Sequence, residues 1–282
     1  MKRRRFLASA LAAGAACATR GGTGRAFRHA ACNGTWEGWA FADVCRDARE
    51  AGYGALEIAP ATVASARPEE LARAMRAEGL ACAGFHALLA GTELHATTPD
   101  RARRERTWEA LRRLADRCRE AGGRFLVFGS GKQRGAVDGS TREDATSRLV
   151  EGLAGLSGRG VEVLIEPLKA PFSDVVNTLD EAADVVRRVG RPDVASMIDC
   201  RHATGEASDP AALVRRHAAI LRHVHVNEAD GRRPGTGRFP FGPLLGALRG
   251  IGYEGWLSLE VFDFSEGGPR IARESIAYLE RF

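Results

Sequence analysis

Residues 161–168 read VEVLIEPL, a short apolar run that ends in an acid and a proline. The run is apolar on both faces, which is typical of a parallel strand covered by helices. The same character predicts seven further strands, at 27–32, 54–58, 80–86, 124–128, 194–199, 221–226 and 256–261. With 161–166 they give eight predicted strands.

Amphipathic segments follow each of these runs. The predicted helices are 41–51, 68–79, 99–121, 141–157, 178–188, 209–218, 241–250 and 270–281. Prolines such as Pro68 mark their starts, and glycines such as Gly190 mark their ends. Eight strand–helix units in one domain predict an α/β chain folded as a (β/α)8 TIM barrel over 27–282. A doubly wound sheet is the alternative, but 33–36 (NGTW) is not the glycine-rich turn that it needs.

The charge of the chain is concentrated at its start. The sequence has 282 residues, is 44% hydrophobic and carries a formal charge of +5, which excludes a disordered chain. Residues 1–18 hold four basic residues and no acid, so the remainder has 41 − 4 = 37 basic and 36 acidic residues, or +1. A nearly neutral body gives no electrostatic footprint for nucleic acid. No apolar run reaches the ~18 residues of a transmembrane span.

Residues 1–26 have the pattern of an export signal followed by a linker. Twin arginines within 3–5 precede Phe-Leu and a small, apolar stretch, and 16–18 (ACA) is a candidate cleavage site. The pattern predicts twin-arginine (Tat) export to the periplasm. Residues 14–17 (GAAC) loosely match a lipobox, so a lipoprotein anchored at Cys17 is the alternative.

Polar residues gather where the predicted strands end. Glu166, Asp199, His225 and Glu260 come at or near the ends of four successive strands. In a TIM barrel these ends form the catalytic face. Three acids there would repel one another, and a divalent cation removes that penalty. Three oxygen donors and one imidazole suit Mn²⁺, Mg²⁺ or Co²⁺ better than Zn²⁺, which favours thiolate-rich sites. For any single acid, an ion pair with an arginine is the alternative.

Five other residues are candidates for contact with a substrate. His202 follows Asp199 by three residues, and His86 and Glu57 lie at strand ends. Arg232 lies beyond the seventh strand, and Trp36 follows the first strand on the same rim. Core packing is the alternative for Trp36 and His86, and a surface-loop histidine is the alternative for His202.

Together these motifs resemble those of the xylose-isomerase-like TIM barrels, the sugar phosphate isomerases and epimerases. The motifs are 165–168 (IEPL), 198–202 (IDCRH), 223–228 (HVHVNE), 234–237 (PGTG) and 259–260 (LE). Within the family they look most similar to ketose 3-epimerases of the tagatose and psicose type. The resemblance covers roughly 27–282.

The resemblance implies a metal-dependent sugar isomerase or epimerase of carbohydrate metabolism. Glu166, Asp199, His225 and Glu260 would hold one divalent metal ion, commonly manganese. Glu166 and Glu260 would also form the acid/base pair that works through an enediolate, and His202 would contact the sugar. Relatives often form dimers or tetramers, so a homo-oligomer is allowed.

The chain departs from the ketose 3-epimerases at two positions. They usually have an arginine six residues after the histidine of the seventh strand, where this chain has Gly231, followed by Arg232. They also tend to carry an acid at the position of Phe172.

Two other functions remain open on the sequence alone. One is an exported lyase or epimerase that acts on 3-keto-glycosides, and the other is a carbohydrate-binding barrel without turnover. Endonuclease IV-like enzymes share the barrel, but their Asp-x-His pair would fall at 230–232 (DGR), so its histidine is absent.

Overall fold

The computed structural model describes residues 27–207 and 209–282. The predicted leader, its linker and Cys17 lie outside these residues. The strands are β1 (Arg28–Cys32), β2 (Ala55–Ile58), β3 (Ala81–Phe85), β4 (Phe125–Phe128), β5 (Glu162–Ile165), β6 (Val194–Asp199), β7 (Leu221–Val226) and β8 (Trp256–Leu259). Each lies within two residues of its predicted bounds, and the largest difference is at β8, which ends at Leu259 instead of 261.

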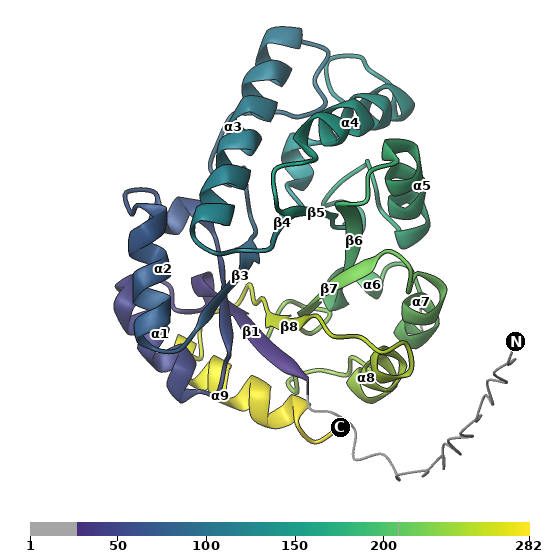
Figure 1. Cartoon of the computed structure of the whole chain (residues 1–282). Helices are drawn as coiled ribbons and strands as arrows, with labels where there is room; N and C mark the ends of the chain where they lie inside the picture. The colour runs from purple at the N-terminus through teal and green to yellow at the C-terminus, as the bar shows by residue number, and fades with distance from the viewer. Residues whose placement is uncertain (1–26, 208) are drawn as a thin grey trace, which may run out of the picture.

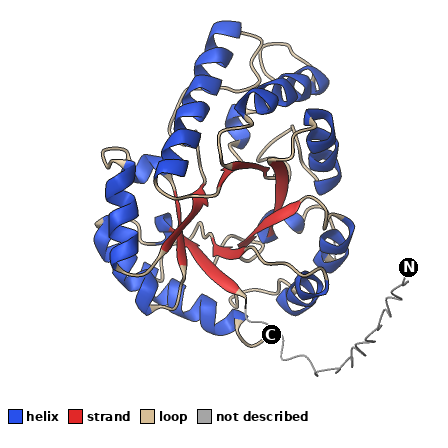
Figure 2. Ribbon diagram, viewed as in Figure 1, coloured by secondary structure: helices blue, strands red, loops and turns tan. Residues whose placement is uncertain are grey.

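The strands form a closed parallel barrel in chain order, β1 to β8. β8 closes onto β1 with a register that runs from Arg28 opposite Trp256 to Ala31 opposite Leu259. Figure 2 shows the strands at the centre of a ring of helices. The predicted TIM barrel is therefore confirmed, and no doubly wound sheet is formed by the described residues.

Helices connect successive strands and cover the outside of the barrel (Figure 1). They are α1 (Phe41–Glu50), α2 (Pro68–Ala77), α3 (Arg101–Glu120), α4 (Arg142–Leu156), α5 (Leu179–Val189), α6 (Cys200–Ala203), α7 (Pro210–Arg216), α8 (Phe241–Gly250) and α9 (Gly268–Leu279). Three short 3-10 turns, η1 (Asn33–Thr35), η2 (Pro60–Val63) and η3 (Gly131–Gln133), follow strands. The sequence had predicted every helix except α6, a single turn.

Local signals place the helix ends where the sequence predicted them. Asp100 caps α3 by accepting a hydrogen bond from the backbone N of Arg103, and Asp209 caps α7 in the same way through Ala211. Gly190 ends α5 with φ +62°, a left-handed conformation that favours glycine. None of the helices described is long and apolar enough to span a bilayer.

The barrel interior is divided into an apolar layer and a polar layer above it. The apolar layer holds small and medium side chains: Ala30, Ala55, Ala83, Phe125, Val127, Leu164, Ala195 and Met197. Strand side chains alternate between faces, so the inward-facing residue two positions later lies one layer higher. Leu164 is thus followed by Glu166, and Met197 by Asp199. The site is built from this upper layer.

Candidate metal centre

Four side chains of the upper layer converge at the carboxyl ends of β5 to β8. Glu166, Asp199, His225 and Glu260 each offer a ligand atom, and these atoms all lie within 4.8 Å of one another. The structure therefore brings together the four residues that the sequence placed at strand ends. We call them the four-residue cluster.

His225 lies at the centre of this cluster. Its Nδ1 atom is 3.0 Å from Glu260 Oε2, 3.8 Å from Glu166 Oε1 and 4.0 Å from Asp199 Oδ2. The imidazole is fully buried, yet Nδ1 makes no hydrogen bond of acceptable geometry within the described chain. A buried nitrogen that faces three carboxylates without a well-aligned hydrogen bond is the donor arrangement of a divalent cation site.

The charges in the cluster are out of balance without a cation. Burial disfavours the charged imidazole, but Glu260 and Glu57 outweigh it and raise the pKa of His225 well above its ordinary value. The protein thus draws a proton into the position where a cation would neutralise the acids. The donor set of three carboxylates and one imidazole fits Mn²⁺ and similar cations.

Glu57 fixes the direction in which His225 points. Glu57 is fully buried, and its Oε1 lies 3.0 Å from His225 Nε2 while its Oε2 lies 2.9 Å from His223 Nε2. The two histidines lower the pKa of Glu57 against the effect of burial, so it is ionised. With Nε2–H donated to Glu57, Nδ1 of His225 is left free for a cation, as in many metal sites. Glu57 is therefore placed to position the two histidines, and its contact with substrate stays a prediction.

His223 is not part of the cluster. Its ring is fully buried, is bonded to Glu57 and lies 4.4 Å from the ring of Phe125, centre to centre. His225, and not His223, is therefore the histidine whose free ring nitrogen faces the carboxylates.

Asp199 is held by two groups that sequence reasoning did not assign. Asn227 donates from Nδ2 to Asp199 Oδ2 at 2.8 Å, and the backbone N of His202 donates to Asp199 Oδ1 at 2.9 Å. Asn227 also accepts from the backbone N of Arg201 at 2.8 Å. Its position two residues after His225, in the same inward phase, is the signal that could have identified it.

Glu166 is accommodated by Gly129, which directly follows the neighbouring strand β4. A Cβ atom at Gly129 would lie 2.1 Å from Glu166 Oε2, so a larger residue there would displace the carboxylate from its position in the cluster. The fully buried Arg134 donates to the carbonyl oxygens of Phe128, Glu166 and Val176 at 2.8, 2.7 and 3.1 Å. Sequence reasoning did not identify Arg134, because nothing in a polar loop marks a buried arginine.

A half-buried arginine stands at the mouth of the barrel between two exposed rings. The Arg201 Cζ atom lies 4.7 Å from the ring centres of both Phe172 and Phe262, which are 41% and 49% exposed. We call these three residues the mouth clamp. Phe172 also meets the ring of His202 edge-on at 5.2 Å. His202 is buried below the clamp, so the predicted substrate residue lies between the clamp and Asp199.

Gly231 leaves space for the mouth clamp. It has φ +86°, and a Cβ atom there would lie 3.1 Å from Phe262 and 3.4 Å from Arg201 Nη1. Arg232, which the sequence predicts to contact substrate, forms an ion pair with Asp230 at 2.8 Å, and its side chain is 44% exposed. A substrate would have to compete with Asp230 for this guanidinium. Arg201 has no carboxylate partner among the described residues, so its guanidinium is available to a ligand at the mouth of the barrel.

The other two candidates, Trp36 and His86, lie in different surroundings. Trp36 is only 2% exposed, and it donates from Nε1 to Asp47 Oδ2 at 2.6 Å and packs edge-on against Tyr53. These contacts favour core packing, the alternative to a substrate contact for Trp36. His86 does reach the upper layer, where its Nδ1 lies 3.7 Å from Glu57 Oε1.

The fold and the site together define a class of protein: a TIM barrel in which three carboxylates and one imidazole form a candidate metal site at the carboxyl ends of the strands. Residues 45–282 match the family described as "Xylose isomerase-like TIM barrel", and the chain belongs to this family. A D-psicose 3-epimerase of Agrobacterium fabrum (strain C58) is 33% identical over 120 residues, or 41% of this chain and 42% of that protein. The chain thus spans about two fifths of that relative's length.

Solved structures agree on the fold over nearly the whole barrel. A D-psicose 3-epimerase with D-tagatose from Clostridium cellulolyticum H10 superposes with a TM-score of 0.81 at 20% identity, covering 90% of this chain and 99% of that one. A 3-keto-D-glucoside 4-epimerase from E. coli also has a TM-score of 0.81 at 20% identity, covering 91% of this chain and 100% of that one.

Proposed function

We propose that the protein is a metal-dependent sugar epimerase or isomerase that moves a proton at the carbon beside a carbonyl group. The observation that carries this proposal is the four-residue cluster, in which Glu166 and Glu260 flank the free Nδ1 of His225. The relatives also support it, because the protein that aligns with part of this chain is named a D-psicose 3-epimerase.

The two carboxylates have complementary tasks in the proposed reaction. Glu166 and Glu260 come from β5 and β8, so they approach a substrate at the mouth from different sides of the barrel. One would remove the proton from a face of the substrate carbon, and the other would deliver a proton to the opposite face. A divalent cation, held by the four-residue cluster, would supply the positive charge that stabilises the enediolate.

The two acids differ in exposure, and hydrogen bonds hold the other two residues of the cluster in place. Glu260 is the more accessible, with 15% of its side chain exposed against 9% for Glu166. Asn227 holds Asp199 by a hydrogen bond, and Glu57 holds His225 in the same way. These two side chains therefore keep their positions while a proton is transferred. Delivery of the proton to the same carbon gives an epimer, and delivery to the neighbouring carbon gives an isomer.

The test is the exchange of each acid for its amide in manganese-loaded protein. We expect Glu260→Gln to abolish turnover of a ketose panel and Glu166→Gln to leave less than about one hundredth of it, the scale of acid–base catalysis. Glu228→Gln serves as the control, because Glu228 is buried but bonded to the backbone N atoms of Gly235 and Phe239. Turnover that survives in both Glu166→Gln and Glu260→Gln would contradict the two-carboxylate mechanism.

A second candidate is the same proton transfer on a 3-keto-glycoside. The mouth clamp favours it, because two exposed phenyl rings and a guanidinium without a carboxylate partner in 27–207 and 209–282 offer a place for a substituent attached to the sugar. One structural neighbour is named a 3-keto-D-glucoside 4-epimerase. Turnover of 3-keto-glycosides but not of free ketoses would favour this candidate.

A further inference from the structure

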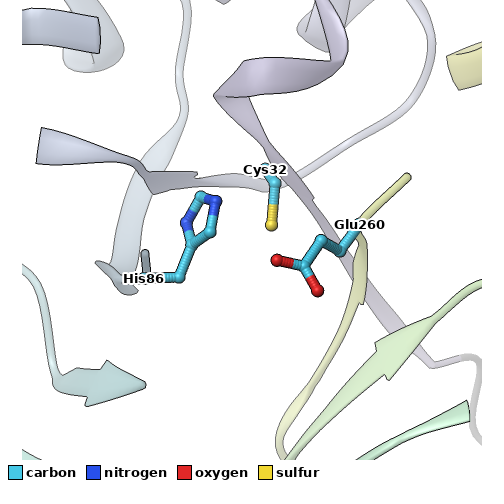
Figure 3. A group of neighbouring side chains, drawn as sticks. All are labelled: Cys32, His86 and Glu260. Carbon is cyan, nitrogen blue, oxygen red and sulfur yellow. The ribbon is translucent and has the colours of Figure 1, made fainter. Parts of the chain in front are cut away.

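A second group of ligand-type side chains lies beside the four-residue cluster. Cys32 ends β1, His86 follows β3, and Glu260 follows β8, and their ligand atoms all lie within 4.8 Å of one another. Cys32 and His86 are 2% and 5% exposed. Figure 3 shows the sulfur, the imidazole edge and the carboxylate directed toward one common space. Sequence reasoning gave Cys32 no role.

Glu260 belongs to both groups. Its Oε2 atom lies 3.0 Å from His225 Nδ1, inside the four-residue cluster. In Figure 3, one carboxylate oxygen points toward the Cys32 sulfur and the other points away from it. A carboxylate placed in this way can hold a cation on each side, as bridging acids do in two-metal sites.

The imidazole of His86 is available as a ligand. Its Nδ1 atom faces Glu57 Oε1 at 3.7 Å and makes no hydrogen bond to the described residues. Glu57 already accepts hydrogen bonds from His223 and His225. It can therefore orient the ring of His86 without binding it tightly. The other ring nitrogen faces Cys32 (Figure 3). A carboxylate behind the imidazole is the usual support of a metal-binding histidine.

The thiol of Cys32 has only a weak contact of its own. Its sulfur lies 3.8 Å from Ser258 Oγ. Burial, followed by the charge of Glu57, raises the pKa of Cys32 well above its ordinary value, so the sulfur keeps its proton when no cation is near. A cation that binds sulfur strongly displaces this proton to solvent and forms a metal–thiolate bond.

We propose that Cys32, His86 and Glu260 form a second divalent-cation site, suited to a thiophilic cation of the zinc class, that shares Glu260 with the four-residue cluster. Sulfur and nitrogen donors select zinc-like cations, whereas the oxygen-rich cluster suits manganese or magnesium. A cation in the second site occupies the carboxylate that the proposed reaction needs. Zinc is therefore an inhibitor of the manganese-loaded enzyme, a consequence that rests on the proposed function.

Cobalt titration tests the site without any use of enzyme activity. The full chain, with Cys17→Ser to remove the thiol outside the described residues, is stripped of metal and titrated with Co²⁺. We expect two Co²⁺ bound per chain and a near-ultraviolet thiolate-to-cobalt absorption band. Cys32→Ser should bind one Co²⁺ and lack the band, whereas Cys45→Ser, which changes a buried thiol of α1, should bind two and keep it.

His86→Gln is a second test of the same site, in case Cys32→Ser does not fold. It keeps the thiol and should weaken the second Co²⁺ by about tenfold or more, the usual effect of losing one part of a metal site. Circular dichroism checks that both variants are folded. A single Co²⁺ without a thiolate band in the parent chain would overturn the proposal, as would a band that persists in Cys32→Ser.

Zinc inhibition then tests the consequence for turnover. Zn²⁺ added to manganese-loaded protein should inhibit, and Cys32→Ser should raise the half-inhibiting concentration about tenfold. Equal inhibition of both proteins would show that zinc acts only by displacing manganese and would overturn the shared-carboxylate consequence. If no substrate is turned over, the cobalt result still decides the site, so the two proposals fail separately.

Discussion

The exchange of Glu57 for glutamine tests how the protein aims His225. The carboxylate accepts hydrogen bonds at 2.9 Å from His223 and 3.0 Å from His225, and no water replaces them because all three side chains are fully buried. Glutamine has the same shape but only one accepting oxygen. Its NH₂ group would face one imidazole N–H, donor against donor, and that histidine would lose its orientation.

The size of the effect follows from these contacts. Loss of one charge-assisted hydrogen bond, with a buried donor left unpaired, is expected to lower the free energy of unfolding by about 2–3 kcal/mol. Loss of the carboxylate behind a metal-binding histidine is expected to weaken Mn²⁺ binding about 10–100-fold. The second effect separates a positioning role from a purely structural one.

Calorimetric titration of Mn²⁺ into metal-free protein, together with urea unfolding, measures both effects. Glu228→Gln is the matched control, because it also removes a buried carboxylate, one that binds the backbone N atoms of Gly235 and Phe239. The control should lose stability and keep its Mn²⁺ affinity. If Glu57→Gln loses stability and binds Mn²⁺ as tightly as the parent chain, the positioning role of Glu57 is refuted.

Three further predictions follow from the site. Arg201→Gln should raise KM for sugar severalfold with a smaller change in kcat, whereas Arg232→Gln should change neither; steady-state kinetics on both variants checks this, and equal effects would refute the mouth clamp. Gly231→Ala should lower the free energy of unfolding by about 1–2 kcal/mol through its left-handed backbone and should raise KM by displacing Phe262. Gly139→Ala, with φ +76° and open space around it, should keep the parent KM, as unfolding and kinetics will show. The raised pKa of His225 stabilises the metal-free protein fully below the unfolded value of about 6.5, and this contribution is lost as pH rises through the higher folded value. Urea unfolding of metal-free protein should therefore show falling stability from pH 6.5 upward, a slope that His225→Gln removes; an unchanged slope would contradict it.

The sequence predicted the barrel because its signals are local. Apolar runs such as 124–128 and 161–166, with glycine stops such as Gly190, fix strands and helices without reference to distant residues. The four-residue cluster was predictable for the same reason, since parallel strands bring their carboxyl ends to one face. The single turn α6 was missed because Cys200–Ala203 is too short for a helical period.

The supporting residues of the site depend on contacts between distant segments. Glu57 and His225 are 168 positions apart, so a strand-end acid could not be separated from a substrate ligand by pattern alone. Trp36 reached the core because Asp47 takes its indole N–H, an interaction that no spacing rule indicates. Arg134 and Asn227 were missed because their partners are backbone carbonyls or a side chain on another strand.

The most direct test of the proposed chemistry is solvent exchange in D₂O, followed by proton NMR. Manganese-loaded protein is offered a panel of ketoses and 3-keto-glycosides, with Glu260→Gln as the matched inactive variant. The account predicts that deuterium enters the carbon beside the carbonyl of one class of sugar, that a new epimer or isomer appears, and that Glu260→Gln does neither. An epimer or isomer formed without deuterium, or exchange that persists in Glu260→Gln, would contradict proton transfer by the two carboxylates.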